Sequence, residues 1–256
     1  MTQVDFGFKK VEAAEKQNLV REVFDNVAPK YDLMNDLMSG GMHRLWKDKM
    51  VNEVRFDDKN KNYKILDVAG GTGDIAFRIL EKAKKQTVSA EIEISDINTE
   101  MLEVGKQRAI DRNFFSKLKF THADGQNLTF ADNSFDYYTI AFGIRNFTDI
   151  NKGLSEAYRV LKPGGKFICL EFSQVNNLIL SKIYNLYSFN VIPKIGKLVA
   201  KDEASYQYLV ESIKRFPNQE KFKKMIMDTG FKNSNYSNLS FGTVAVHTGI
   251  KAPTNL

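Results

Sequence analysis

The chain has 256 residues, of which 43% are hydrophobic and 27% are charged, the composition of a globular domain with a sizeable core. Its formal net charge of +6 is spread along the chain, and without a run of about five or six Lys or Arg a nucleic-acid arm is not indicated. The mild basic excess fits either a lysine-rich solvated surface or attraction to anionic lipid headgroups. Residues 1–10 lack the apolar stretch of a signal peptide, and no apolar run reaches the roughly 18 residues of a membrane span. We therefore expect a cytoplasmic protein, at most peripheral at the inner face of the membrane.

Residues 1–60 are predicted to form an N-terminal helical cap. Apolar residues recur at helical spacing from Leu19 to Val27, and Pro29 follows as a stop. A second amphipathic segment runs over residues 45–54. Two helices are therefore expected ahead of the core.

Residues 63–173 alternate between short apolar runs and amphipathic stretches, which is typical of strands joined by helices in parallel βαβ units. The only cysteine, Cys169, falls in the last apolar run, so it is predicted to be buried, and a reducing compartment fits. The pattern predicts a doubly wound sheet that binds a cofactor. The expected strands are 64–69, 88–95, 118–123, 135–142 and 166–172, and the expected helices are 75–83, 98–110 and 150–161.

Residues 218–256 add a helix at 222–229 and two strands at 231–239 and 243–251, joined by a short turn. An antiparallel ending on a parallel sheet distinguishes methyltransferases from ordinary dinucleotide folds. An apolar insertion, residues 174–217, lies before this ending. It is predicted either to pack as helices on the core or to form a lid over an apolar substrate pocket, since insertions at the carboxyl edge of the sheet lie over the ligand crevice.

A glycine loop, residues 67–74 with the sequence Asp-Val-Ala-Gly-Gly-Thr-Gly-Asp, follows the first core strand and opens a helix. Its glycines let the backbone turn tightly and approach a ligand closely, but nicotinamide-dinucleotide folds use a related loop. Asp67, at the end of the strand, separates the two cases. An acid at this position would repel a pyrophosphate, whereas it suits the cationic amino-acid end of S-adenosylmethionine, directly or through water. The loop therefore predicts a site for this methyl donor.

Two more acids follow core strands at the same edge of the predicted sheet. Asp96 comes after the second strand and is predicted to take both hydroxyls of an adenosine ribose, although an Asp there could instead cap the helix that begins near Asn98. Asp124 follows the third strand and is predicted to accept the adenine amino proton, or to serve only as a turn residue. Residues 140–146, at the end of the fourth strand, face the same crevice, and chemistry is expected there.

The chain closely resembles the ubiquinone/menaquinone biosynthesis C-methyltransferases over nearly its whole length. The most specific matches are residues 31–39 (Tyr-Asp-Leu-Met-Asn-Asp-Leu-Met-Ser) and residues 142–146 (Phe-Gly-Ile-Arg-Asn). The other matches lie at residues 6–8, 23–30, 43–47, 70–74 and 158–165. The last of these blocks is common to many methyltransferases, so it is less specific.

This resemblance implies methyl transfer from S-adenosylmethionine to a ring carbon of a polyprenylated quinol, namely demethylmenaquinol, 2-methoxy-6-polyprenyl-1,4-benzoquinol or both. It also implies cofactor contacts at Thr72, Asp96 and the Asp124–Gly125 pair. Ala141 is a departure, because several relatives have serine there, so a hydroxyl contact is lost while the backbone can still touch the cofactor. No metal is expected. The full set of residues predicted to bind the cofactor is Asp67, Gly70, Gly71, Thr72, Gly73, Asp96, Ile97, Asp124, Gly125 and Ala141.

The patterns and the resemblance together predict an α/β fold, that of the class I S-adenosylmethionine-dependent methyltransferases. Such a fold is Rossmann-like, with a seven-stranded, mostly parallel sheet and an antiparallel terminal strand. N-terminal helices and a helical lid insertion complete the prediction. The whole chain, residues 1–256, is expected to be a single domain.

The predicted catalytic residues are Arg145, Asn146 and Tyr31, because a ring carbon becomes a good nucleophile only when a neighbouring hydroxyl is deprotonated. A guanidinium is too basic to act readily as a simple base. Arg145 can instead stabilise a phenolate, or orient a water that takes the proton. Alternatively, Arg145 is a surface ion-pair partner of Asp149. The histidines are predicted to be structural: His43, His122 and His247.

The expected partner is the polyprenylated quinol, whose tail needs an apolar channel or access to the bilayer. Residues 178–192, with lysines nearby, could lie on a membrane surface. Membership of a quinone-biosynthesis complex and a homodimer are further hypotheses, and no nucleic-acid partner is expected. The rival functions are a methyltransferase for another small molecule or RNA, a non-catalytic cofactor-binding scaffold and a nicotinamide oxidoreductase.

Overall fold

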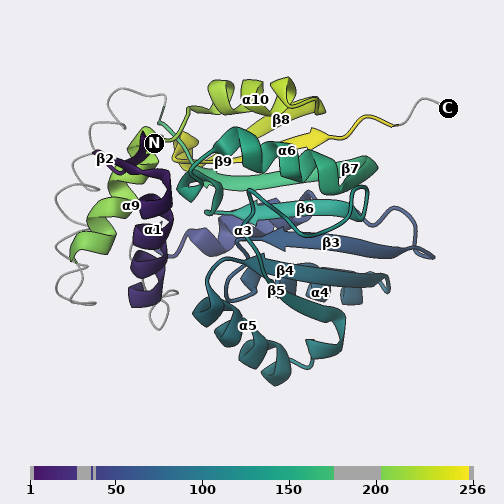
Figure 1. Cartoon of the computed structure of the whole chain (residues 1–256). Helices are drawn as coiled ribbons and strands as arrows, with labels where there is room; N and C mark the ends of the chain where they lie inside the picture. The colour runs from purple at the N-terminus through teal and green to yellow at the C-terminus, as the bar shows by residue number, and fades with distance from the viewer. Residues whose placement is uncertain (1–2, 28–35, 37–38, 176–202, 254–256) are drawn as a thin grey trace.

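The computed structural model describes residues 3–27, 36, 39–175 and 203–253 (Figure 1). Seven strands form one sheet in the order β5-β4-β3-β6-β7-β9-β8. Neighbouring strands are parallel, except that β9 is antiparallel to both β7 and β8. The predicted mostly parallel sheet with an antiparallel terminal strand is therefore confirmed. The strands are β3 (Asn62–Val68), β4 (Ser89–Asp96), β5 (Leu118–His122), β6 (Phe135–Ala141), β7 (Leu161–Phe172), β8 (Lys232–Leu239) and β9 (Val244–Ile250).

Helices cover both faces of the sheet, as Figure 1 shows. Because side chains alternate along a strand, Ile65 of β3 packs on one face and its neighbour Leu66 on the other, and both are fully buried. The Ile65 face is covered by α3 (His43–Asn52), α4 (Asp74–Lys85) and α5 (Thr99–Asp111). The Leu66 face is covered by α6 (Ile150–Val160) and α10 (Gln219–Asp228).

Two more helices, α1 (Ala13–Val27) and α9 (Glu203–Arg215), contact each other at one end of the sheet (Figure 1). A short 3-10 helix, η3 (Ile144–Asn146), follows β6 and contacts α9. Two others, η2 (Phe115–Lys117) and η4 (Ser240–Gly242), precede β5 and β9. Among the described residues no helix is both long and apolar enough to cross a bilayer.

The prediction that the first sixty residues are helical is wrong at the very start. There β1 (Gln3–Phe6) and β2 (Lys9–Glu12) form a hairpin around a two-residue turn, in which Gly7 has a φ of +58°. The hairpin is held from outside, because Phe6 stacks on Tyr208 of α9 with ring centroids 4.2 Å apart. So short and polar a segment has no hydrophobic period of its own, and its strand state depends on α9.

Strand β7 also differs from the prediction, since it begins at Leu161 rather than at residue 166. Leu161 pairs with Phe135, and the register then shifts before Tyr137 pairs with Lys166. The Pro163–Gly165 stretch lies at this irregularity. Cys169, in the same strand, is fully buried as predicted.

Candidate active site

A cavity lies where β3, β4 and β6 end, beside the point at which the strand order reverses between β3 and β6. This is the place where open α/β sheets bind their ligands. The space between the lining atoms is about 880 Å³, open solvent at its mouth included. The residues predicted from the sequence that line it are Gly70, Gly71, Thr72, Asp96, Ile97, Asp124, Gly125, Ala141 and Asn146.

The glycine loop forms the cavity wall between β3 and α4. Gly71 has a φ of +48°, and Gly73, the residue before α4, has a φ of +82°, so both occupy the left-handed region that glycine tolerates best. A Cβ on Gly71 would also lie 3.0 Å from the Met101 side chain. These two positions therefore need glycine for the backbone to pass so close to the cavity.

Asp67, at the start of this loop, is bonded to Thr139 of the neighbouring strand β6, and it does not line the cavity. Its side chain is buried, Oδ1 accepts a hydrogen bond from the Thr139 hydroxyl at 2.7 Å, and Oδ2 has no partner among the described residues. Burial raises the pKa of Asp67 to about 7. The structure therefore provides an unsatisfied carboxyl beneath the loop, but it does not place Asp67 in direct contact with the space a ligand would fill.

Helix α3 holds the other side of the loop through Lys47. The Lys47 Nζ lies 2.8 Å from Oδ2 of Asp74, the first residue of α4. Burial opposes ionisation of Asp74, but Lys47 and Arg78 outweigh it and lower the pKa of this carboxyl to about 2. An ionised Asp74 at a helix N-terminus also has a favourable interaction with the helix dipole. The Lys47–Asp74 pair thus keeps the glycine loop and α4 in place.

Asp96 lies on the cavity wall at the end of β4. Its Oδ2 accepts a hydrogen bond from the Gly71 N–H at 2.9 Å, and its Oδ1 accepts one from the Asn98 N–H at 2.8 Å. Burial raises the pKa of Asp96 to about 6. The alternative that Asp96 caps the next helix is wrong, because the cap of α5 is Asn98, whose side chain accepts from the Met101 N–H.

Asp124, after β5, has the turn role considered for it and also lines the cavity. Its Oδ1 accepts from the Gln126 N–H at 2.9 Å, a local turn bond. Its Oδ2 accepts instead from the Gln17 side chain of α1 at 3.1 Å, and the residue lines the cavity. One oxygen therefore fixes the turn, while the other faces helix α1 and accepts a hydrogen bond from it.

Helix α1 roofs the cavity, which was not predicted. Four of its residues line the space: Gln17, Val20, Arg21 and Phe24. The helix is fastened at both ends, because the Lys16 Nζ donates to the Phe147 carbonyl at 2.8 Å and Asp25 accepts from the Asn98 side chain at 2.7 Å. The apolar period of this helix was visible in the sequence, but it indicates only a buried face and not what that face covers.

Arg145 and Asn146 lie together in η3, but they face different surroundings. Asn146 lines the cavity, whereas Arg145 is buried beside it and does not. The Arg145 Nη1 donates to Oε1 of Glu171 at 2.9 Å and to the Phe142 carbonyl. The alternative of a surface pair with Asp149 is wrong, because Asp149 caps α6 by accepting from the Lys152 N–H. The partner that the sequence did not reveal is Glu171.

Three other predicted features have simpler outcomes. Tyr31 lies outside the described residues, as do residues 178–192 and most of the predicted lid. Helix α9, the described helix of that insertion, contributes no residue to the cavity wall.

Burial lowers the pKa of His247 to about 4. Each histidine is held by a contact of its own, at 2.9 to 3.2 Å: His43 to Asp36, His122 to the Ile97 carbonyl and His247 to the Gln219 carbonyl.

The family follows from comparison with known proteins. The model of the ubiE/COQ5 methyltransferase family matches residues 10–251. This chain belongs to the ubiE/COQ5 methyltransferase family. The ubiquinone/menaquinone biosynthesis C-methyltransferase UbiE of Rickettsia bellii (strain OSU 85-389) is 58% identical over 251 residues, covering 98% of this chain and 100% of that protein.

Solved structures agree with the ubiE/COQ5 assignment at the level of the fold. The chain is similar to a putative methyltransferase in complex with the Haloferax volcanii Trm112 activator, with a TM-score of 0.62 and 14% identity over 93% of this chain and 99% of that one. It is also similar to phosphoethanolamine N-methyltransferase 2 of Haemonchus contortus, solved with S-adenosyl-L-methionine, with a TM-score of 0.59 and 18% identity over 81% and 52% of the two chains. The fold is that of a class I S-adenosylmethionine-dependent methyltransferase.

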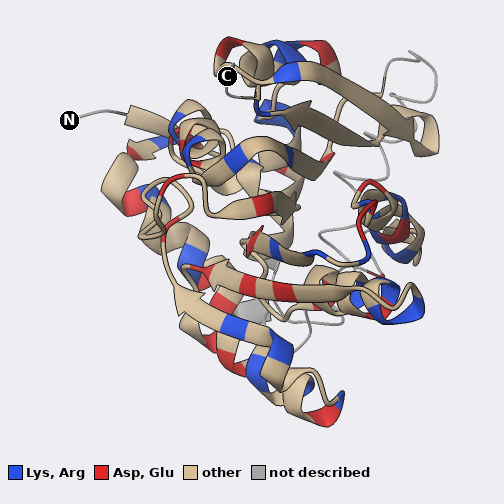
Figure 2. Ribbon diagram, turned by 90° about the vertical axis from the view of Figure 1, so that its right-hand side faces the viewer, with Lys and Arg blue, Asp and Glu red and all other residues tan. Residues whose placement is uncertain are grey.

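The residues present fit S-adenosylmethionine as the methyl donor of this ubiE/COQ5 member. The glycine wall admits close backbone approach, Asp96 and Asp124 offer carboxylate oxygens at separate points of the wall, and Asp67 places an unsatisfied acid under the loop. A pyrophosphate would meet these acids unfavourably. In the view of Figure 2 basic and acidic residues are interspersed over the described helices.

Proposed function

We propose that this protein transfers a methyl group from S-adenosylmethionine to a ring carbon of a polyprenylated quinol in menaquinone or ubiquinone biosynthesis. The observation that carries the proposal is one cavity on which Asp96, Asp124 and Asn146 converge, in a chain of this family. The relative at 58% identity, named a ubiquinone/menaquinone biosynthesis C-methyltransferase, supports the acceptor class. The acceptor would be demethylmenaquinol, 2-methoxy-6-polyprenyl-1,4-benzoquinol or both.

The cavity wall supplies the groups that hold the donor. Asp96 accepts from ribose hydroxyls, and the Oδ2 of Asp124 accepts from the adenine amino group in place of Gln17. Gly71 keeps the backbone within reach of the ligand. When bound, S-adenosylmethionine supplies an electrophilic methyl group. Helix α1 excludes water above it, which strengthens every charge interaction inside the cavity.

Arg145 and Asn146 supply the groups for the acceptor. The acceptor carbon gains nucleophilicity as a neighbouring hydroxyl loses its proton, and a fixed positive charge stabilises the phenolate that results. Arg145 brings such a charge beside the cavity, and its Nε has no partner among the described residues. A guanidinium stays protonated, so a water oriented by Arg145 passes the hydroxyl proton on to solvent. After the methyl group has moved from sulfur to the ring carbon, that carbon loses its hydrogen as a proton and the aromatic quinol is restored. Asn146, on the cavity wall, orients the ring.

The test is methyl transfer to a defined quinol. Purified protein is incubated under reducing conditions with ¹³C-methyl-labelled S-adenosylmethionine and each of the two quinols carrying a short prenyl chain. We expect a labelled methyl group on a ring carbon of at least one quinol, detected by NMR and mass spectrometry. Donor binding without any ring methylation would contradict the proposal, and label on oxygen would indicate a different methyltransferase activity.

We also propose a peripheral membrane contact for this protein in the cytoplasm, because a polyprenyl tail partitions into the bilayer. The predicted contact, residues 178–192, lies outside the described residues, so the support is the chemistry of the acceptor and the apolar sequence of that segment. Flotation with anionic liposomes tests it. We expect wild-type protein to float and a variant lacking residues 178–192 to stay at the bottom, and equal behaviour of the two would contradict it.

A further inference from the structure

Glu171 is a buried carboxylate at the end of β7 that the methyl transfer described above does not use. Its side chain is fully buried. Oε1 accepts from the Arg145 Nη1 at 2.9 Å and from the Phe172 N–H at 2.8 Å. Oε2 accepts from the backbone N–H of Arg145 at 3.3 Å. One carboxylate therefore holds both the guanidinium and the main chain of the same arginine.

This double hold determines where η3 lies. Phe142, two residues before η3, has a φ of +56°, an uncommon conformation for a bulky side chain, and its carbonyl accepts from the Arg145 side chain. Asn146 follows Arg145 directly, and its Oδ1 accepts from the Tyr208 hydroxyl of α9 at 2.9 Å. Glu171 on one side and Tyr208 on the other thus enclose the Arg145–Asn146 pair between β7 and α9.

A buried ion pair is poor support for stability as such. The Arg145 and Glu171 side chains are only 3% and 0% exposed, so removal of both charges from water offsets much of their mutual attraction, and a well-packed apolar pair often does as well. The pair moreover leaves the Arg145 Nε buried without a partner in the described part of the chain, which adds to the free-energy cost of burying this arginine. Glu171 thus holds the Arg145 guanidinium in one orientation next to Asn146, which lines the cavity.

We propose that Glu171 is a positioning residue for methyl transfer. Through Nη1 and the backbone N–H it orients the Arg145 guanidinium toward the acceptor ring. Glu171 itself touches neither donor nor acceptor. The inference rests on the proposed role of Arg145 in that reaction, and it extends that role to a residue on a different strand.

A double-mutant cycle in the quinol methylation assay tests the proposal. The variants are Glu171→Gln, Arg145→Gln and the double variant, with turnover counted per donor-loaded enzyme. We expect Glu171→Gln to lower kcat about 10- to 100-fold, as loss of an orienting partner does, with the Kd for S-adenosylmethionine unchanged. We expect the double variant to be no slower than Arg145→Gln, because Glu171 acts only through that arginine. A merely structural Glu171 would slow the double variant by a further factor equal to its own, and that result would overturn the proposal.

Two more variants keep the test decisive. If Glu171→Gln does not fold, Glu171→Asp replaces it, because aspartate keeps the negative charge on a shorter side chain. We expect Glu171→Asp to lose less kcat, and full activity of this variant would overturn the proposal.

Glu156→Gln is the matched control. Glu156 pairs with Arg159 away from the cavity, and the kcat of this variant stays at the wild-type value. If Arg145→Gln turns over normally, the proposed role of Arg145 fails. If Arg145→Gln is slow while Glu171→Gln and Glu171→Asp are fully active, only the present inference fails.

Discussion

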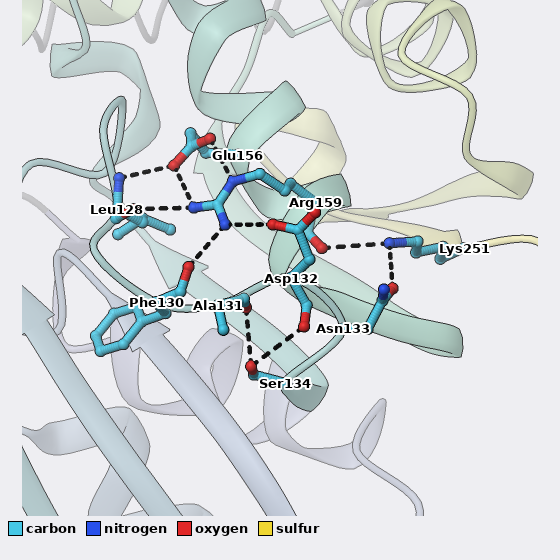
Figure 3. A network of polar contacts seen from close by, with 9 residues as sticks. All are labelled: Leu128, Phe130, Ala131, Asp132, Asn133, Ser134, Glu156, Arg159 and Lys251. Carbon is cyan, nitrogen blue, oxygen red and sulfur yellow. Dashed lines mark hydrogen bonds and ion pairs between the residues drawn. The ribbon is translucent and has the colours of Figure 1, made fainter.

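Two arginines of this protein each pair with a glutamate, and they are bound in opposite ways. Arg159, on α6, has an acceptor for every N–H of its guanidinium (Figure 3). These acceptors are the Glu156 carboxylate, the Asp132 carboxylate and the Leu128 and Phe130 carbonyls. Arg145 is more deeply buried than Arg159, with a side chain 3% exposed against 29%, yet its Nε has no partner among the described residues.

The difference separates a structural arginine from one suited to chemistry. Arg159 fastens the loop between β5 and β6 to α6, and with all its donors in use it has nothing to offer a ligand. Within the described residues the Arg145 side chain is anchored through Nη1, its backbone N–H donates to Glu171, and its buried Nε has no partner. Burial without full hydrogen bonding is expensive, so it persists where function requires it.

The largest effect is expected from Arg145→Gln. Loss of the guanidinium removes the positive charge that stabilises the phenolate, so we expect kcat to fall by about 10²- to 10³-fold. The donor site is separate, so the Kd for S-adenosylmethionine should stay within about threefold, measured by calorimetry. Arg159→Gln is the control for loss of an arginine, and comparable turnover losses in the two variants would break the contrast.

A loss of stability without a loss of turnover is expected from Arg159→Gln. The change leaves the Leu128 and Phe130 carbonyls without their donor, so we expect the free energy of unfolding to fall by about 1 to 3 kcal/mol. Urea titration measures this, and kcat at a temperature well below the melting point should equal that of the wild type. If turnover fell while stability stayed constant, Arg159 would be the functional arginine.

A pH dependence of stability is expected from Asp67 and Asp96. Burial raises the pKa of both carboxyls in the folded protein, to about 7 and about 6, above the usual value of 3.8. The folded state therefore holds protons that the unfolded chain has lost, and stability decreases as the pH rises from about 4 to 7. Between pH 6 and 7 the slope for Asp67 is up to about 1.4 kcal/mol per pH unit.

Asp67→Asn tests this assignment, because an amide does not titrate. Urea titrations of the cofactor-free protein at pH 6 and pH 7 should show the difference in the wild type and a much smaller one in the variant, in which only Asp96 still titrates. Glu103→Gln, at an exposed position on α5, serves as the control and should retain the wild-type slope. An unchanged slope in Asp67→Asn would mean that another group titrates there.

The smallest effect is expected from Gln17→Ala. Gln17 occupies the Asp124 oxygen that we assign to the adenine amino group, so its removal should tighten binding of S-adenosylmethionine about two- to tenfold, the value of one hydrogen bond. Calorimetry measures the change. Glu22→Ala, an exposed position on the same helix, should leave the affinity unaltered, and weaker binding by Gln17→Ala would show that Gln17 helps to hold the donor.

The sequence predicted those parts of the site that depend on local pattern. The glycine loop, Asp96 and Asp124 each follow a strand, and parallel strands bring their carboxyl ends to one edge, so these residues had to converge. The Arg145–Asn146 block was also found, through family resemblance. The strands of the core were placed within a few residues because their apolar runs are long and bounded by turns.

The remaining features depend on contacts between distant segments. Glu171 lies in an apolar run that reads simply as a buried strand, and its role appears only when β6 and β7 place it beside Arg145. The roof formed by α1 looks in sequence like any amphipathic helix. The hairpin of residues 3–12 is stabilised by Tyr208 and Glu211 of α9, far along the chain. No local period encodes such partners.

The central claim is that Arg145, and not Arg159, acts on the quinol. Its most direct test is the initial rate of quinol ring methylation by Arg145→Gln and Arg159→Gln in one assay, at saturating S-adenosylmethionine and at equal concentrations of folded enzyme. The account predicts a rate at least about a hundredfold lower for Arg145→Gln than for Arg159→Gln, which should match the wild type. Equal rates for the two variants would contradict it.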